Sequence, residues 1–169
     1  MAHPPPHLAV GRGSTYETAT RVADRVYIGG YISASDPALL RAAGVTHILK
    51  VFRGEEGYTR HPGVVYAVIP VDDTPDADLR GFLPAALRYI RAALAEGGCV
   101  LVHCHAGISR SATVVLFYLM CDRGLALDTA LHRLKTVRPQ VQPNAGFLRH
   151  LRAIDASLAR LRARAEARR

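Results

Sequence analysis

An α/β fold, with a central and mostly parallel sheet flanked by helices, is the architecture that this sequence predicts. Three β-branched apolar runs typical of buried strands, VTHILKV, VVYAVIPV and CVLVHC, are separated by segments with helical periodicity. Strands that alternate with helices favour a parallel sheet covered on its faces. The chain has 169 residues, 49% of them hydrophobic and 21% charged, which is most simply one domain with its own core.

The beginning of the chain supplies outer strands and one helix with clear end signals. Residues 1–19 are rich in Pro, Gly and His, and we expect a flexible arm there. RVADRVYIGG, residues 21–30, predicts two short strands around an Ala-Asp-Arg turn. In the helix that follows, Asp36 is the expected N-cap, Pro37 takes the first position, and Gly44 lies past the end.

Two strands and a long helix come next. VTHILKV (residues 45–51) and VVYAVIPV (residues 64–71) predict buried strands. A helix is expected from Ala77 to Glu96, because apolar residues recur there at helical spacing and Gly97-Gly98 ends the pattern. The apolar stripe of this helix consists of Leu79, Phe82, Leu83, Leu87, Ile90 and Leu94.

The second half of the chain pairs a central strand with three helices. CVLVHC is a buried strand, and residues 109–122 are apolar nearly all round, which predicts a central helix. Asp128 is expected to cap a helix through Val137. Asn144 opens the last helix, whose apolar stripe consists of Phe147, Leu148, Leu151, Ile154, Leu158 and Leu161.

The net charge of +8 comes mainly from the C-terminus. Residues 149–169 hold seven Arg against Asp155 and Glu166, a balance of +5. We therefore expect a folded domain over residues 20–158 and an Arg-rich helix end over residues 159–169. Such an end is typical of a solvated helix face. Contact with an acidic partner, a membrane surface or nucleic acid is the alternative, although no aromatic residue there could stack on bases.

The sequence also bears on the cellular compartment. No apolar run is long enough to cross a membrane, and the N-terminus lacks the basic and apolar blocks of a secretory signal. Three cysteines without framework spacing favour a reducing compartment over a disulfide scaffold. We expect an intracellular, cytoplasmic location and leave a nuclear or virion location open.

The loop VHCHAGISRS, residues 102–111, is the strongest candidate for a functional site. Cys104 ends a buried strand, and the loop leads directly into a helix, whose N-terminus favours anions. Gly107 allows the backbone to curl, and Arg110 offers a planar fork for two phosphate oxygens. We predict a cup for a phosphate group, formed by His105, Ala106, Gly107, Ile108, Ser109 and Arg110.

The same surroundings predict a reactive thiol. A helix N-terminus and a nearby cation lower the pKa of a cysteine, so Cys104 would be a thiolate nucleophile at neutral pH. Its attack on a bound phosphate would form a cysteinyl-phosphate that water then hydrolyses. Arg110 and the amide groups would stabilise the transition state, and the Ser111 hydroxyl could hydrogen-bond the departing sulfur.

HCHAGISRS resembles the signature loop of the dual-specificity branch of the cysteine-based protein tyrosine phosphatases, His-Cys-x-x-Gly-x-x-Arg-Ser/Thr. The resemblance extends over about residues 20–155 and includes RVADRVYIGG, AAGVTHILKV and PNAGFLRHL. It implies a protein tyrosine phosphatase-like fold and an enzyme that hydrolyses phosphotyrosine and phosphoserine/phosphothreonine. It implies neither a metal nor a cofactor. The His residues show no ligand spacing, so we expect no metal site.

The general acid should come from IPVDDTPDADL, where Asp72, Asp73, Asp76 and Asp78 follow a strand. Any of them could instead be a turn or cap residue. The resemblance places the acid three residues past an Ile-Pro pair, which implies Asp73, with Asp72 as the second choice. Asp78 is expected to cap the next helix.

Supporting roles are expected for two further residues. The resemblance implies that His103 fixes the loop through hydrogen bonds and points away from substrate. Asn144 is expected either to brace the site or to serve only as an N-cap. Cys99 and Cys121 are expected to be packing residues rather than redox partners of Cys104.

Substrate identity is less well specified by the sequence. VRPQVQPN keeps Arg138 alone where relatives often carry two or more basic residues, which argues against a second-phosphate site. Arg53 and Arg60 are the remaining candidates for substrate recognition. The alternatives are a phosphoinositide or RNA 5′-phosphatase on the same fold, or a phosphate-reading binding module. We expect a phosphoprotein partner rather than nucleic acid, and we leave homodimer formation open.

Overall fold

The computed structural model describes residues 9–10, 17–54 and 60–168. They form a six-stranded sheet with the order β1-β2-β3-β6-β4-β5. Strands β3, β6, β4 and β5 are parallel, and β2 pairs antiparallel with both β1 and β3. The strands are β1 (Ala9–Val10), β2 (Ala19–Ala23), β3 (Val26–Gly29), β4 (His47–Lys50), β5 (Val65–Val68) and β6 (Val100–His103). The prediction of a mostly parallel central sheet is therefore confirmed.

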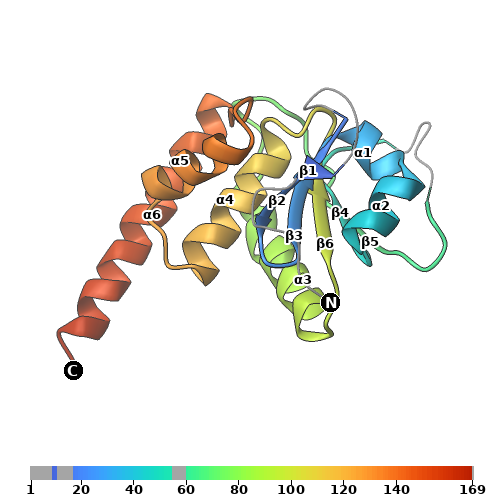
Figure 1. Cartoon of the computed structure of the whole chain (residues 1–169). Coiled ribbons are helices and arrows are strands. Elements are labelled where there is room, and N and C mark those ends of the chain that lie inside the picture. The colour runs from blue at the N-terminus through green and yellow to red at the C-terminus, as the bar shows by residue number, and fades with distance from the viewer. Residues whose placement is uncertain (1–8, 11–16, 55–59, 169) are drawn as a thin grey trace.

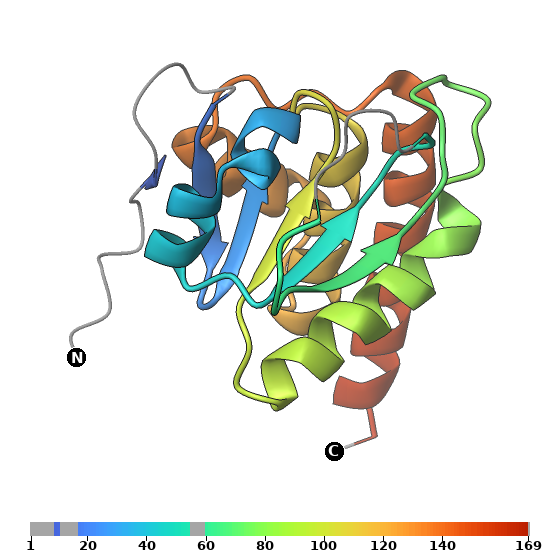
Figure 2. The same ribbon diagram turned by 90° about the vertical axis from the view of Figure 1, so that its right-hand side faces the viewer.

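Helices cover both faces of this sheet, as Figures 1 and 2 show. They are α1 (Tyr31–Ser35), α2 (Pro37–Ala43), the 3₁₀ turn η1 (Arg80–Phe82), α3 (Leu83–Ala95), α4 (Arg110–Asp122), α5 (Leu127–Val137) and α6 (Ala145–Glu166). One face packs against α1 and α2, and the other against α3, α4, α5 and α6. Alternate residues of the central strand serve the two faces, since Leu101 faces α2 while Val100 and Val102 face the larger layer.

The local signals for two helices are confirmed. Asp36 accepts hydrogen bonds from the backbone of α2, Pro37 is its first residue, and Gly44 is left-handed with a φ of +67°. Helix α4 begins at Arg110 and is buried on nearly all sides, so the fold is built around the helix that follows the Cys104 loop.

Three sequence predictions need correction. Strand β5 is not buried: it is the outermost strand of the sheet, and its Val65 and Val68 are 53% and 41% exposed. The α-helix predicted from Ala77 begins only at Leu83, after a 3₁₀ turn that places Phe82 38% exposed. Asp128 lies within the first turn of α5, and Ala126 occupies the N-cap.

Part of each chain end lies within the described residues. Strand β1 lies within the predicted arm and pairs with Ala19 and Thr20 of β2, whereas residues 1–8 and 11–16 lie outside the described residues. Helix α6 carries the Arg-rich end and extends away from the sheet in Figure 1. No helix of the described residues has the length and apolar character that a membrane crossing needs.

Candidate active site

The loop between β6 and α4 surrounds the sulfur of Cys104 with hydrogen-bond donors. Cys104 is 2% exposed, and its Sγ lies 3.2 Å from the Ser111 hydroxyl. Burial raises the pKa of this thiol. The Ser111 hydroxyl and the backbone N–H groups of Ser111, Ile108 and Gly107 lower it more, so the pKa of Cys104 is below its usual value. The site therefore favours a thiolate.

A buried arginine explains why those amides point inward. Arg138 is fully buried and donates hydrogen bonds to the carbonyl oxygens of Ala106 (3.2 Å) and Gly107 (2.9 Å). Each carbonyl points opposite to the N–H of the same peptide plane. Holding these two carbonyls on the outside therefore turns the N–H groups of Gly107 and Ile108 toward the sulfur. The Ile108 carbonyl is held in the same way by the backbone N–H of Gln142, at 2.9 Å.

Gly107 is needed for this turn. Its φ is +70°, and an added Cβ would lie 2.5 Å from Arg138 Nη2 and 2.6 Å from the carbonyl oxygen of Gly29. A side chain would thus be strained in conformation and would also collide with the arginine that shapes the loop.

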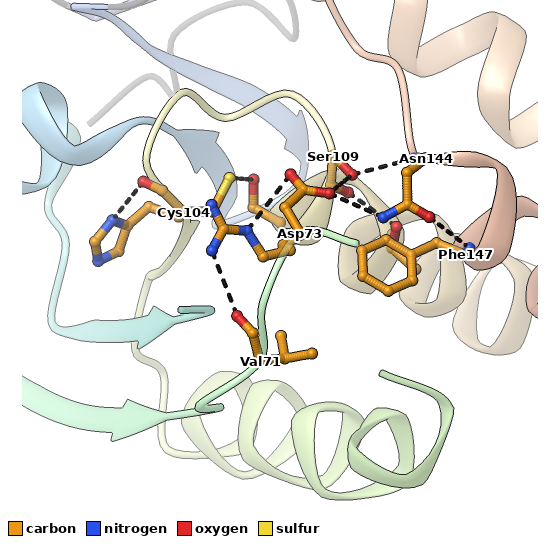
Figure 3. Close-up of polar contacts among 10 residues, drawn as sticks. Val71, Asp73, Cys104, Ser109, Asn144 and Phe147 are labelled. Atoms are coloured by element: carbon orange, nitrogen blue, oxygen red, sulfur yellow. Dashed lines mark hydrogen bonds and ion pairs between the residues drawn. The ribbon is translucent and has the colours of Figure 1, made fainter. Parts of the chain in front are cut away.

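Among the four candidate carboxylates, only Asp73 is held against the loop. Its Oδ1 accepts hydrogen bonds from Ser109 Oγ (2.6 Å) and Asn144 Nδ2 (2.9 Å), and its Oδ2 lies 3.5 Å from Arg110 Nε. Figure 3 shows Asp73 between the Cys104 loop and the start of α6. Asp72 instead pairs with Arg53 at 3.2 Å, and Asp78 accepts from the backbone of Gly81 at the 3₁₀ turn.

Asn144 has both of the roles that the sequence left as alternatives. Its Oδ1 accepts the backbone N–H of Phe147 at 3.0 Å, which caps α6. Its Nδ2 donates to Asp73, and its own backbone N–H donates to Ser109 Oγ at 3.1 Å. The N-terminus of α6 thereby links the loop of the carboxylate to the loop of the thiol.

Arg110 extends toward the same opening. Its Nη1 is 3.4 Å from the carbonyl oxygen of Val71, and its guanidinium carbon lies 6.0 Å from the centre of the Phe52 ring. Within the described part of the chain, the buried Nε makes no hydrogen bond and only faces Asp73. A buried guanidinium donor that makes no hydrogen bond, beside a thiolate and an inward-facing amide arc, is suited to the oxygens of a phosphate group.

Known proteins resemble this chain in sequence and in fold. The family model "Dual specificity phosphatase, catalytic domain" matches residues 26–156. The chain belongs to the dual-specificity phosphatase family. It is 40% identical over 134 residues to Dual specificity protein phosphatase 1 of Arabidopsis thaliana, covering 79% of this chain and 67% of the relative. It is also 40% identical over 138 residues to Dual specificity phosphatase 28 of Mus musculus, with 82% and 84% covered.

Solved structures agree with these relatives. The crystal structure of human DUSP28 aligns with a TM-score of 0.78 at 35% identity, over 93% of this chain and 97% of that chain. The chain is thus a phosphatase of the dual-specificity type, and catalysis through a cysteine is general to its family. A phosphatase domain implies phosphoprotein substrates.

Behind the loop of this phosphatase, His103 lies fully buried with Nδ1 3.2 Å from the Cys104 carbonyl oxygen. Burial lowers the pKa of His103 to about 3, so the ring is neutral and Nδ1 can donate to that carbonyl. The Phe52 ring packs on His103 at 5.6 Å and on His105 at 4.2 Å between ring centres. His105 itself is exposed on the rim, and its pKa is lowered by burial and by Arg110 and Lys50.

The other candidates lie apart from the cup. The Cys99 thiol is buried, donates to the Ala43 carbonyl oxygen at 3.5 Å, and has its pKa raised to about 11 by burial. Arg60 stacks on a ring of its own segment, with its guanidinium carbon 5.4 Å from the centre of the Tyr66 ring. Cys121 is half-buried near the end of α4. Both cysteines are placed as packing residues rather than beside Cys104.

Sequence reasoning missed three parts of the site. Arg138 was considered only as a remnant of a phosphate-recognition cluster, but it is fully buried beneath the loop and cannot contact substrate. Nothing in the sequence marks Phe52 or Gly146 as a site residue. Gly146 lies so close to the loop of Asp73 that an added Cβ would be 1.8 Å from the Pro75 carbonyl oxygen. The sequence signal for this contact is that Gly146, a poor helix former, is the second residue of the helix that Asn144 caps.

Proposed function

We propose that Cys104 is the nucleophile of this dual-specificity phosphatase, that Arg110 and the amides of the 105–110 loop bind the phosphate, and that Asp73 is the general acid. One observation carries the proposal: the sulfur that accepts three backbone amides lies at the same opening as the facing pair Arg110 and Asp73. A nucleophile, an anion site and an acid are thus contributed by adjacent loops.

In the first step the Cys104 thiolate attacks phosphorus, and the bond to the ester oxygen breaks. The leaving oxygen takes the proton of Asp73 and departs as an alcohol or phenol. The equatorial oxygens gain charge in the transition state, where the inward amides and the fork of Arg110 stabilise them. The product of this step is a cysteinyl-phosphate on Cys104.

In the second step a water molecule attacks the phosphorus of that intermediate. The Asp73 carboxylate now accepts a proton from the water, which is the reverse of its first role. The Ser111 hydroxyl, 3.2 Å from Sγ, donates to the sulfur as the P–S bond breaks. Inorganic phosphate leaves, and the thiolate is restored.

Substrate binding changes the environment of the acid. Arg110 faces Asp73 Oδ2 in the free protein, and a phosphate dianion would attract the same guanidinium. Moving Arg110 onto the phosphate removes a positive charge from Asp73 and places negative charge nearby.

The cup is suited to one phosphate group. Residues 105–109 contribute no Lys or Arg, and Arg138 is buried, so neither can hold a further phosphate of a lipid headgroup. This supports phosphotyrosine and phosphoserine/threonine in proteins over phosphoinositides and RNA 5′-phosphates. Because catalysis needs a free thiolate, we place the activity in a reducing, intracellular environment.

The test is steady-state hydrolysis of an aryl phosphate against pH, without added metal. Cys104→Ser should abolish turnover, whereas Cys99→Ser, a matched change at a buried thiol, should keep it. Asp73→Asn should remove the basic limb of the bell-shaped pH profile, and Asp72→Asn should preserve that limb. Turnover by the folded Cys104→Ser protein, or a basic limb that moves with Asp72, would contradict the assigned roles.

A further inference from the structure

A second concave surface lies outside the catalytic cup. It is a groove of about 780 Å³ between the end of β2, the end of α4 and the side of α5. Its lining residues are Arg21, Val22, Ala23, Asp24, Leu119, Arg123, Leu125, His132, Arg133, Leu134, Thr136 and Val137. The volume falls within the range of ordinary ligand sites.

The floor of this groove is apolar. Leu119 and Leu134 are buried at its base, and Val22, Leu125 and Val137 are only half-buried, so part of their surface still meets solvent. Covering half-buried apolar side chains releases free energy in proportion to the area removed from water. The floor therefore favours an occupant with apolar side chains.

The rim of the groove is basic. Exposed Arg123, His132 and Arg133 surround the floor, and within the described residues the guanidinium groups of Arg123 and Arg133 make no hydrogen bond or ion pair. Asp24 is the one acidic lining residue, and it is already paired with Arg21 at 2.9 Å. Counting His as neutral, three Arg against one Asp give the lining a charge of +2.

We propose that this groove is a docking site for an acidic protein segment that carries apolar side chains between its Asp and Glu residues. Charge complementarity selects that partner. The chain's own ends are unsuitable, because residues 1–16 contain no acidic residue and residues 159–169 contain five Arg and one Glu. A second copy is disfavoured too, since each chain carries a net charge of +8.

The groove is separate from the catalytic cup. Ala23 pairs with Val26, which lies beside Val100 at the start of β6, whereas Cys104 follows the end of that strand. Arg123 follows the 13 residues of α4, a helix roughly 20 Å long. A phosphoprotein that reaches Arg123 and the cup at once needs at least about six extended residues between the acidic segment and its phosphorylated residue.

The experiment measures fluorescence anisotropy of a labelled, unphosphorylated ten-residue peptide with alternating Glu and Leu, titrated with the full chain. Arg123→Glu combined with Arg133→Glu should weaken binding at least about tenfold. Arg88→Glu combined with Arg152→Glu makes the same charge change at exposed residues outside the groove and should leave binding unchanged. A peptide with Ser in place of Leu should bind at least about tenfold more weakly, because the floor would stay uncovered.

Several results would overturn the proposal. Equal binding by both double variants would mean that overall charge, not the groove, attracts the peptide, and equal binding of the Ser peptide would remove the role of the floor. Competition with vanadate would place the peptide in the catalytic cup. Absence of peptide binding, together with groove-dependent binding to phosphatidylserine vesicles, would reassign the surface to a membrane. Aryl phosphate turnover tests the catalytic assignment separately, so the two proposals fail independently.

Discussion

Replacing Gly146 by Ala should misplace Asp73, the proposed general acid, without touching it. The added Cβ would lie 1.8 Å from the carbonyl oxygen of Pro75 and 2.5 Å from its carbonyl carbon. To reach even 3.0 Å from that oxygen, the two segments must separate by 1.2 Å. The colliding atoms are backbone, so no rotamer change relieves the contact. Helix α6 is anchored by the fully buried Phe147 and Leu151, whereas the loop around Pro75 is exposed. We therefore expect the loop to move.

The expected loss is selective for leaving groups that need a proton. A misplacement of about 1 Å can reduce a rate by about 10²-fold. The kcat/KM for phenyl phosphate should fall by about that factor, while activated aryl phosphates, whose leaving groups are stable as anions, should lose much less. Overpacking costs about 1–3 kcal/mol of stability, partly offset by up to about 1 kcal/mol from the better helix propensity of Ala.

The assay is kcat/KM across a series of aryl phosphates with leaving groups of increasing pKa, together with urea unfolding. Gly146→Ala should give a steep dependence on leaving-group pKa, similar to that of Asp73→Asn. Ala145→Gly changes the same helical turn at an exposed position and should keep the wild-type dependence on leaving-group pKa, with a loss of stability of at most about 1 kcal/mol. A slope equal to the wild type, or an equal loss for all leaving groups, would refute the reasoning.

Three other predictions test the surroundings of the sulfur. Ser111→Ala removes a donor to the thiolate, so the pKa of Cys104 should rise and iodoacetamide alkylation at pH 6 should slow by about tenfold, as stopped-time mass spectrometry would show. Arg138→Met leaves the Ala106 and Gly107 carbonyls without their donor, so the free energy of unfolding in urea should fall by about 3 kcal/mol. Inhibition of turnover by inorganic phosphate should weaken as well, and unchanged inhibition would contradict the role of Arg138 in shaping the loop. Because the pKa of His103 is lowered to about 3, the unfolded chain binds a proton there below about pH 6.5 and the folded chain does not. Between about pH 6.5 and pH 3, the free energy of unfolding should therefore fall as the pH is lowered, by up to ~1.4 kcal/mol per pH unit. A His103→Asn variant should lose this slope.

Local chemistry explains what could be predicted from the sequence. The strand order of apolar runs and helices, the caps at Asp36 and Gly44, and the turn from Cys104 into a helix all depend on residues close together in the chain. The proposed nucleophile Cys104 and the proposed phosphate ligand Arg110 were predicted in the same way, and Asp73 was predicted with the help of the family resemblance.

The parts that could not be predicted depend on contacts between distant segments. Arg138 donates hydrogen bonds to the carbonyl oxygens of Gly107 and Thr18, which are 31 and 120 residues away in the sequence. A sequence shows an arginine but not the carbonyls that will surround it, so a buried scaffold residue looked like a surface cation. The exposure of β5 was missed for a similar reason, because an apolar run does not reveal whether its strand will be an inner or an outer one.

The two carboxylate oxygens of Asp73 have different hydrogen-bonding partners, and these partners come from distant parts of the chain. Ser109 and Asn144 both donate to Oδ1, so that oxygen is held as an acceptor. Oδ2 faces Arg110, and in the proposed mechanism it is the oxygen that meets the leaving group. Since Asn144 also caps α6, the helix that buries Phe147 in the core helps to orient the carboxylate of Asp73. The acid is thus oriented by the fold as a whole rather than by its own loop.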